Sequence, residues 1–237
     1  MLDTILFDLD GTLLPLDQDV FIEKYFSMLA MTMAGKGFDP KQIVKGVMYG
    51  TGAMLKNDGK KTNEAVFWDR FAEIFGERAR DDEPYFEEFY VNDFDKVKAV
   101  CGFTPKARDA VELTKSLGLR IALATTPIFP AVATKKRMSW AGLSPEDFEL
   151  YTTYENSHHC KPSTEYYREV AGALNLAPCE CLMVGNDVGD DMPAVELGMK
   201  VFLLTDCFIN KENKDISSYP HGGFDELFAF LKALVQP

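Results

Sequence analysis

The chain has 237 residues, of which 46% are hydrophobic and 26% are charged, which is ordinary for a soluble globular protein. Its 25 Lys and Arg residues against 37 Asp and Glu residues give a formal net charge of −12. An acidic surface repels polyanions, so we expect neither nucleic acid nor an anionic membrane as a partner. A small anionic ligand is still compatible with this charge, because a local cation can reverse the field inside one pocket.

The first residues, Met1-Leu2-Asp3, lack the basic segment and apolar run of a secretion signal, and no apolar run in the chain is long enough to cross a bilayer. We therefore expect a cytoplasmic location. Five cysteines at irregular spacing form neither a zinc motif nor a disulfide framework, so free thiols are expected. These features leave the oligomeric state open, and a monomer is favoured.

An apolar run near the start, Thr4 to Phe7, is followed by two carboxylates, Asp8 and Asp10, and then by Gly11. The run has the composition of a buried strand, and the glycine allows a sharp turn after it. Side chains alternate along a strand, so the two carboxylates project from the same face. Two neighbouring carboxylates repel, which favours either a cation between them or the protonation of one.

The segment from residue 16 to residue 100 contains helical patterns and no convincing strand. Helices are predicted from Asp19 to Ala34, from Pro40 to a break at Gly50-Thr51-Gly52, from Thr62 to Gly76, and from about Pro84. Aromatic residues recur in them at spacings of three and four, which indicates a packed core. The glycine-rich break is interpreted either as a plain turn or as a loop that contacts a ligand, with Lys56 as a second contact.

After residue 103 short apolar runs alternate with helical patterns. Strands are predicted at 119–125, 148–152, 181–185 and 200–205, and helices at 105–117, 130–141, after Pro162, at 192–197 and near the C-terminus. This alternation predicts an α/β fold, a Rossmann-like doubly wound parallel sheet with helices on both faces. We predict a core domain of residues 1–15 and 101–237 that carries an all-helical domain of residues 16–100.

Polar side chains gather where these strands end. Asp8 and Asp10 follow the first strand, Thr125 and Thr126 follow the second long strand, and Asn186 to Asp191 follow the strand 181–185. Lys161 lies in a loop between the last two. Ligands of parallel sheets bind beyond the carboxyl ends of the strands, so this placement indicates one functional site.

The order and chemistry of these motifs resemble the haloacid dehalogenase (HAD) superfamily of hydrolases, in its phosphatase-type subclass I with a helical C1 cap after the first motif. Asp8-Leu9-Asp10-Gly11-Thr12 is similar to the first motif, Thr125 to the second and Lys161-Pro162 to the third. Asp187 with Asp191 is similar to the fourth. The sequence departs from the family at Asn186, where many members have an acid, so we assign that role to Asp187. The choice among Asp187, Asp190 and Asp191 as the direct metal ligand stays open.

The resemblance implies a Mg²⁺-dependent reaction. Asp8 would attack phosphorus to form an aspartyl-phosphate, and Asp10 would protonate the leaving alcohol and then activate water. Thr125, Thr126 and Lys161 would hold the phosphoryl oxygens, and the metal ligands would be Asp8, Asp10 through its carbonyl, and Asp187, with Asp191 as a further candidate.

The resemblance therefore predicts a phosphatase for a small phosphorylated metabolite. An acid at Asp10 favours phosphate esters over halide removal, because a halide leaving group needs no proton. Two alternatives are a phosphomutase acting on a sugar phosphate and a family member that acts mainly as a binding protein.

Overall fold

A computed structural model describes residues 2–234 of the chain. Its centre is a parallel six-stranded sheet with strand order β3-β2-β1-β4-β5-β6. The strands are β1 (Thr4–Phe7), β2 (Arg120–Leu123), β3 (Leu150–Tyr151), β4 (Cys181–Gly185), β5 (Lys200–Leu204) and β6 (His221–Gly222). The predicted parallel α/β fold is confirmed, although the two-residue β6 was not predicted. Met1 and residues 235–237, which belong to the predicted core range, lie outside the described residues.

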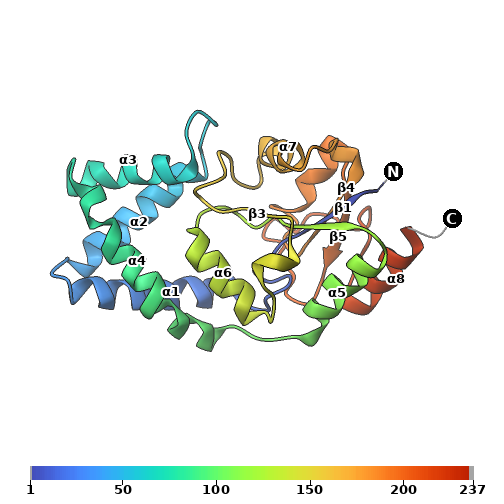
Figure 1. Cartoon of the computed structure of the whole chain (residues 1–237), viewed down its shortest axis with the longest axis horizontal. Coiled ribbons are helices and arrows are strands. Elements are labelled where there is room, and N and C mark those ends of the chain that lie inside the picture. Colours follow the sequence, from blue (N-terminus) through green and yellow to red (C-terminus); the bar gives the residue numbers. More distant parts are fainter. Residues whose placement is uncertain (1, 235–237) are drawn as a thin grey trace.

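Strand β1 lies in the middle of the sheet and is buried throughout, with Thr4 in register with Arg120 of β2 and Cys181 of β4. Its alternating side chains enter two separate hydrophobic cores: Ile5 and Phe7 join one, and Leu6 joins the other. Helices cover both faces, with α7 on one face and α5 and α8 on the other (Figure 1). The α-helices that follow residue 100 are α5 (Pro105–Ser116), α6 (Ala131–Trp140), α7 (Thr164–Ala173) and α8 (Phe224–Leu234).

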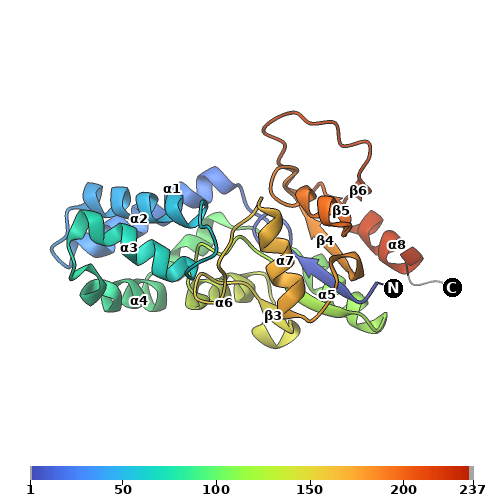
Figure 2. The ribbon, with the colours of Figure 1, turned by 90° about the horizontal axis from the view of Figure 1, so that it is seen from above.

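Residues 18–100, which we call the helical insert, leave the sheet after β1 and return to it at α5. The insert consists of α1 (Gln18–Ala34), α2 (Pro40–Met54), α3 (Asn63–Phe75), α4 (Glu83–Asn92) and two short 3₁₀ segments at 79–82 and 94–100. Asp17, Asp39 and Thr62 cap the first three helices through their side chains. The insert forms one end of the molecule and the sheet the other (Figure 2).

The predicted break of the second helix at Gly50-Thr51-Gly52 is wrong, because α2 continues through these residues to Met54. Glycine weakens a helix on its own, but here it permits close packing between helices. A Cβ atom on Gly50 would lie 2.5 Å from Cδ2 of Phe67 in α3. Tertiary packing therefore explains the glycine, and Thr51 is a helical residue and not part of a loop.

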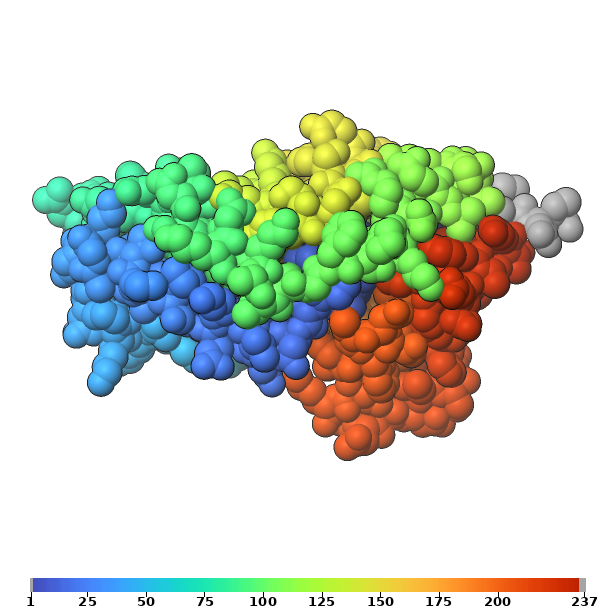
Figure 3. Space-filling view, turned by 90° about the horizontal axis from the view of Figure 1, so that it is seen from below, coloured from blue at the N-terminus to red at the C-terminus, as the bar shows by residue number. Residues whose placement is uncertain are grey.

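Asn63, the first residue of α3, attaches the helical insert to loops of the sheet. Its side chain is fully buried, and its amide nitrogen donates to the carbonyl oxygens of Pro127 (3.1 Å) and His159 (3.3 Å). Its backbone N–H donates to the carbonyl of Ser157 at 2.8 Å. In the space-filling view the blue-to-teal insert lies at one side and the orange-to-red C-terminal part at the other, and the green segment around residue 100 lies between them (Figure 3).

The structure also bears on two expectations from composition. All five cysteines are free thiols, as predicted. None of the helices described between residues 2 and 234 combines the length and the apolar character needed to cross a membrane.

Candidate active site

The carboxyl ends of the strands meet the helical insert at a cavity of about 290 Å³. Every site residue assigned from the motifs lines this cavity, together with Asn186 and Asp190, whereas Lys56, the predicted second contact, does not. Residues more than 170 positions apart in the chain are thus brought to one place by the parallel strands. The predicted residues that line it are Asp8, Asp10, Thr125, Thr126, Lys161, Asp187 and Asp191.

Lys161 joins two buried carboxylates at the floor of the cavity. Its Nζ donates to Oδ1 of Asp8 at 2.8 Å and to Oδ1 of Asp191 at 2.6 Å. Lys161 and Asp191 are each 1% exposed, and Asp8 is 6% exposed. Water therefore screens these charges poorly, and each ion depends on its partners for compensation.

The pKa values of Asp8 and Lys161 are shifted by burial and by the presence of two carboxylates around one ammonium group. Burial raises the pKa of Asp8 to about 7, against the lowering effect of Lys161. Burial alone would lower the pKa of Lys161, but Asp191 and Asp8 outweigh it and raise that pKa well above its usual range. Lys161 is therefore charged at neutral pH, while a further cation beside Asp8 would favour the ionised carboxylate.

Thr12 and Asn186 fix the turn that follows β1. The Thr12 hydroxyl lies 3.1 Å from both Oδ2 of Asp8 and Oδ1 of Asn186. Asn186 is 2% exposed, and its amide nitrogen donates to the carbonyl of Cys207 at 2.6 Å. A Cβ on Gly11 would lie 2.3 Å from that nitrogen, so only glycine fits there. Asn186 thus holds the turn that carries Asp8 and Asp10, a contact that the sequence did not reveal.

Asp187 and Asp190 lie in the loop after β4. Oδ1 of Asp187 accepts hydrogen bonds from the backbone N–H groups of Gly189 (2.7 Å) and Asp190 (3.2 Å). The backbone N–H of Asp187 donates in turn to Oδ2 of Asp191 at 2.9 Å. Burial raises the pKa of Asp190 to about 6, and the Lys161 charge opposes this shift. The loop is therefore ordered by its own carboxylates and presents several oxygen atoms to the cavity.

Thr125 and Thr126 continue the chain beyond β2. The carbonyl of Thr125 accepts hydrogen bonds from the hydroxyls of Thr152 (2.6 Å) and Tyr166 (2.9 Å), and its side chain is buried at the cavity wall. Ala124 is joined to β1 by a hydrogen bond of 2.7 Å to the carbonyl of Phe7. These contacts hold Thr125 in place at the wall of the cavity that Asp8 also lines, and Thr126 follows it in the chain.

Arg137 of α6 is a charged residue at this site that we did not predict. Its guanidinium donates to Oδ2 of Asp10 and to Oγ1 of Thr134 and lies 4.5 Å from the centroid of the Phe129 ring. Arg137 is only 1% exposed. Asp10 lines the cavity, and its second oxygen, Oδ1, is buried without a hydrogen-bond partner among residues 2–234, so Arg137 occupies only one of its two oxygens.

Replacing Arg137 by methionine is expected to lower the free energy of unfolding by roughly 3 kcal/mol, because Asp10 then loses its charged partner. Urea unfolding of Arg137→Met, Asp10→Asn and the double variant measures the coupling, which we expect at roughly 1–3 kcal/mol. Lys135→Met, at an exposed position of the same helix, is the control. Additive losses in the double variant would contradict a stabilising ion pair.

The donor atoms of the cavity fit a hard divalent cation. Five carboxylates line it, from Asp8, Asp10, Asp187, Asp190 and Asp191, and no thiol or imidazole does. Within residues 2–234 no three His, Cys, Asp or Glu side chains are arranged to bind a metal by themselves. Mg²⁺ commonly takes only one or two carboxylates and completes its shell with water, so this set of oxygen atoms is compatible with it.

The motifs and fold define a hydrolase of the haloacid dehalogenase type. The sequence profile of that family, described as haloacid dehalogenase-like hydrolase, matches residues 2–197. The chain therefore belongs to the haloacid dehalogenase-like hydrolases, and the family prediction is confirmed. Comparison with curated proteins finds no match.

Solved structures of this family have the same fold at low sequence identity. A 2-haloacid dehalogenase from Pseudomonas syringae aligns with a TM-score of 0.66 and 17% identity over 100% of both chains. A HAD phosphatase from Thermococcus onnurineus aligns with a TM-score of 0.56 and 17% identity over 98% of both chains. A HAD family enzyme from Bacteroides thetaiotaomicron, in complex with magnesium and inorganic phosphate, aligns with a TM-score of 0.50 and 17% identity. The alignment covers 92% of this chain and 98% of the Bacteroides chain. Because the neighbours include phosphatases and a dehalogenase, the reaction must be argued from the site.

Proposed function

We propose that the protein is a Mg²⁺-dependent phosphatase that hydrolyses a small phosphate monoester through an aspartyl-phosphate on Asp8. The observation that carries the proposal is the pair of acids after β1, which line the same cavity: Asp8 is bound to Lys161, and Asp10 has one oxygen, Oδ1, with no hydrogen-bond partner among residues 2–234. A nucleophile and a proton donor that face one cavity are the two groups this chemistry requires.

In the first step a carboxylate oxygen of Asp8 attacks phosphorus, and the bond from phosphorus to the ester oxygen breaks. Asp10 donates a proton from Oδ1 to the leaving alkoxide, which departs as an alcohol. Lys161 and the hydroxyl or backbone N–H groups of Thr125 and Thr126 stabilise the negative charge on the phosphoryl oxygens. The products of this step are the alcohol and a phosphorylated Asp8.

In the second step water attacks the phosphorus atom of the aspartyl-phosphate. Asp10, now ionised, accepts a proton from the water, and the bond between phosphorus and Asp8 breaks. Inorganic phosphate leaves and Asp8 is regenerated. Arg137 keeps Asp10 oriented during both steps through the other carboxylate oxygen, Oδ2.

The Mg²⁺ would be held by Asp8, the backbone carbonyl of Asp10, and Asp187, with Asp191 and Asp190 as further candidates. When bound, it supplies positive charge that offsets the repulsion between Asp8 and the phosphoryl group. The magnesium and phosphate complex of the Bacteroides thetaiotaomicron enzyme supports this choice of metal for the shared fold.

We further propose that residues 1–15 and 101–237 form the catalytic core and that residues 16–100 act as its cap. The insert contributes Gln18, Phe21, Ile22, Thr51 and Leu55 to the wall of the catalytic cavity, which supports this division. A cap in this position excludes water from the reaction and contacts the leaving group.

Asp10 favours hydrolysis of an ester over dehalogenation, because a halide leaves without a proton. Among phosphoryl-transfer enzymes, a phosphomutase is the nearest alternative, and incubation with a sugar bisphosphate distinguishes the two by whether phosphate is released or moved. A family member that only binds a ligand would have no need of both acids.

Metal removal tests the proposal on the whole protein. We expect release of phosphate from 4-nitrophenyl phosphate with Mg²⁺, no release after dialysis against EDTA, and recovery when Mg²⁺ is added again. A panel of phosphorylated metabolites and 2-chloropropionate would be assayed in parallel. Chloride release without any phosphate release would overturn the proposal.

A further inference from the structure

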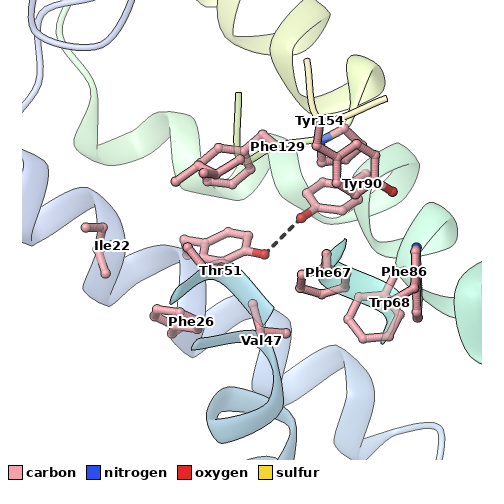
Figure 4. A pocket seen from close by; sticks show the side chains of 13 residues that line it. Ile22, Phe26, Val47, Thr51, Phe67, Trp68, Phe86, Tyr90, Phe129 and Tyr154 are labelled. Carbon is pink, nitrogen blue, oxygen red and sulfur yellow. Dashed lines mark hydrogen bonds between the residues drawn. The ribbon is translucent and has the colours of Figure 1, made fainter. Parts of the chain in front are cut away.

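A second cavity, of about 120 Å³, lies between the helical insert and the chain that follows β2. Of its thirteen lining residues, eight are aromatic and none is charged, so the cavity is mainly apolar. Figure 4 shows the rings of Phe67, Trp68, Phe129 and Tyr154 around a common space. These rings come from α3 and from two loops at the end of the sheet, so the cavity exists only where the insert meets the core.

The aromatic cavity adjoins the catalytic cavity. Four residues line both: Ile22 of α1, Thr51 of α2, and Ile128 and Phe129 from the segment after β2. That segment begins with Thr125 and Thr126, which we have assigned to the phosphoryl group. One continuous stretch of chain therefore runs from the phosphoryl site to the aromatic cavity, and a ligand bound at Asp8 has an apolar compartment beside it.

Loose packing of the insert does not explain the cavity. Protein interiors contain few voids larger than a water molecule. Elsewhere α2 and α3 pack very closely, since Cβ atoms on Gly46 and Gly50 would lie 2.6 Å from Phe75 and 2.5 Å from Phe67. An apolar cavity of about 150 Å³ accepts benzene, so a void of this size and lining suits one aromatic ring.

The polar groups of the cavity are few and none is charged: they are four hydroxyls and the indole N–H of Trp68, which is buried without a hydrogen-bond partner among residues 2–234. The hydroxyls of Tyr25 and Tyr90 lie 2.9 Å apart and bond to each other. Burial raises the pKa of Tyr25 to about 12 and that of Tyr90 well above its usual range, so both are neutral at neutral pH. The several hydroxyls of a sugar would lose more hydration here than these few polar groups can replace, whereas an aromatic ring would not.

We propose that this cavity binds the leaving group of the substrate, and that the substrate class is the phosphate monoesters of alcohols that carry an aromatic ring. The inference rests on the proposed phosphatase activity. The phosphoryl group lies at Asp8, Lys161 and Thr125, and the ring enters between the insert and Phe129. The catalytic step is unchanged: the bond from phosphorus to the ester oxygen breaks, and Asp10 protonates the leaving alkoxide, which departs as the alcohol that carries the ring.

The test compares benzyl phosphate with ethyl phosphate, two esters of primary alcohols that differ mainly in the ring. We expect the wild type to hydrolyse benzyl phosphate with a kcat/KM at least about tenfold higher. Val47→Phe fills the aromatic cavity from α2 at a residue that does not line the catalytic cavity. This variant should lower kcat/KM for benzyl phosphate by about tenfold or more, and its kcat/KM for ethyl phosphate should stay within about twofold of the wild-type value. Val91→Phe, at an exposed position of α4, is the matched control and should change neither.

Equal kcat/KM values for the two esters in the wild type, or an equal loss of both in a folded Val47→Phe variant, would overturn the inference while leaving the phosphatase proposal standing. If Val47→Phe does not fold, Val47→Leu provides the same comparison with less added volume.

A binding measurement separates this inference from the proposed function. The chain has two tryptophans, and only Trp68 lines the cavity. In a Trp140→Phe variant, benzyl alcohol should change the Trp68 fluorescence saturably, and Val47→Phe should weaken that binding about tenfold. Saturable binding without hydrolysis of any ester would refute the phosphatase and retain the aromatic site. Hydrolysis without saturable binding of benzyl alcohol would refute the aromatic site and retain the phosphatase.

Discussion

Asp8→Asn is expected to abolish phosphate release from 4-nitrophenyl phosphate, a fall of at least about 10⁴-fold, in the presence of saturating Mg²⁺. An amide has no charged oxygen with which to attack phosphorus, and no other side chain in the cavity is placed both beside Lys161 and at the end of β1. Asp109→Asn, at an exposed position of α5, serves as the control and should keep full activity. Full activity in Asp8→Asn would refute the aspartyl-phosphate mechanism.

The stability of Asp8→Asn distinguishes loss of chemistry from loss of folding. The pKa of Asp8 is raised by burial to about 7, so the native state binds a proton more tightly than the unfolded state does. A group of this kind destabilises the native state increasingly as the pH rises from about 4 toward 7. The asparagine variant removes this effect. Without added Mg²⁺, its free energy of unfolding relative to wild type should therefore be more favourable at pH 8 than at pH 5, as urea titrations would measure.

Features encoded by neighbouring residues could be predicted from the sequence. The run Thr4–Phe7 followed by Asp8 and Asp10 predicted a buried strand with acids at its carboxyl end, and the structure has both. Asp39 and Thr62 each place a short polar side chain before a helical pattern, and α2 and α3 begin directly after them, whereas the Asp17 cap of α1 lies two residues before the predicted start at Asp19. Once the strands were predicted to be parallel, the common location of their polar ends followed from geometry.

Features that depend on tertiary contacts could not be predicted. Arg137 is 127 residues from Asp10 in sequence, and one arginine in a mixed helix has the pattern of a solvated residue until the fold buries it. Gly50 has the propensity of a helix end, but the Phe67 ring uses the space that a side chain would fill. Asn186 departs from the acidic pattern, and its contact with Thr12 depends on the pairing of β1 with β4. In each case the partner is distant in sequence.

Lys161→Met is expected to cause the largest loss of stability, roughly 3–5 kcal/mol at pH 8, and to abolish phosphate release. Methionine matches the lysine side chain as far as Cε but leaves the carboxylates of Asp8 and Asp191, both almost fully buried, facing each other without a cation. The expected loss of stability exceeds the hydrophobic gain from an apolar side chain, because removing the lysine leaves two buried carboxylates without a compensating positive charge. Urea unfolding measures the stability, and Lys135→Met is the control for the loss of an exposed lysine.

The pH dependence of this loss follows from the sign of the pKa shift. Without Lys161 the pKa of Asp8, already raised to about 7 by burial, should rise further, so the native state of the variant binds more protons than its unfolded state. The stability of Lys161→Met relative to wild type should therefore recover as the pH falls from 8 to 5. An equal deficit at both values would show that lost packing, and not charge, causes the effect.

A double variant separates the structural role of Lys161 from its role in the reaction. Asp191→Asn in the Lys161→Met background removes one of the two uncompensated carboxylates, so part of the lost stability should return, with a coupling of roughly 1–3 kcal/mol. Phosphate release should not return, because the phosphoryl oxygens still lack the ammonium group that offsets their charge. Recovery of both properties would mean that Lys161 only neutralises Asp191 and Asp8, and that the cation needed for phosphoryl transfer comes from the metal alone.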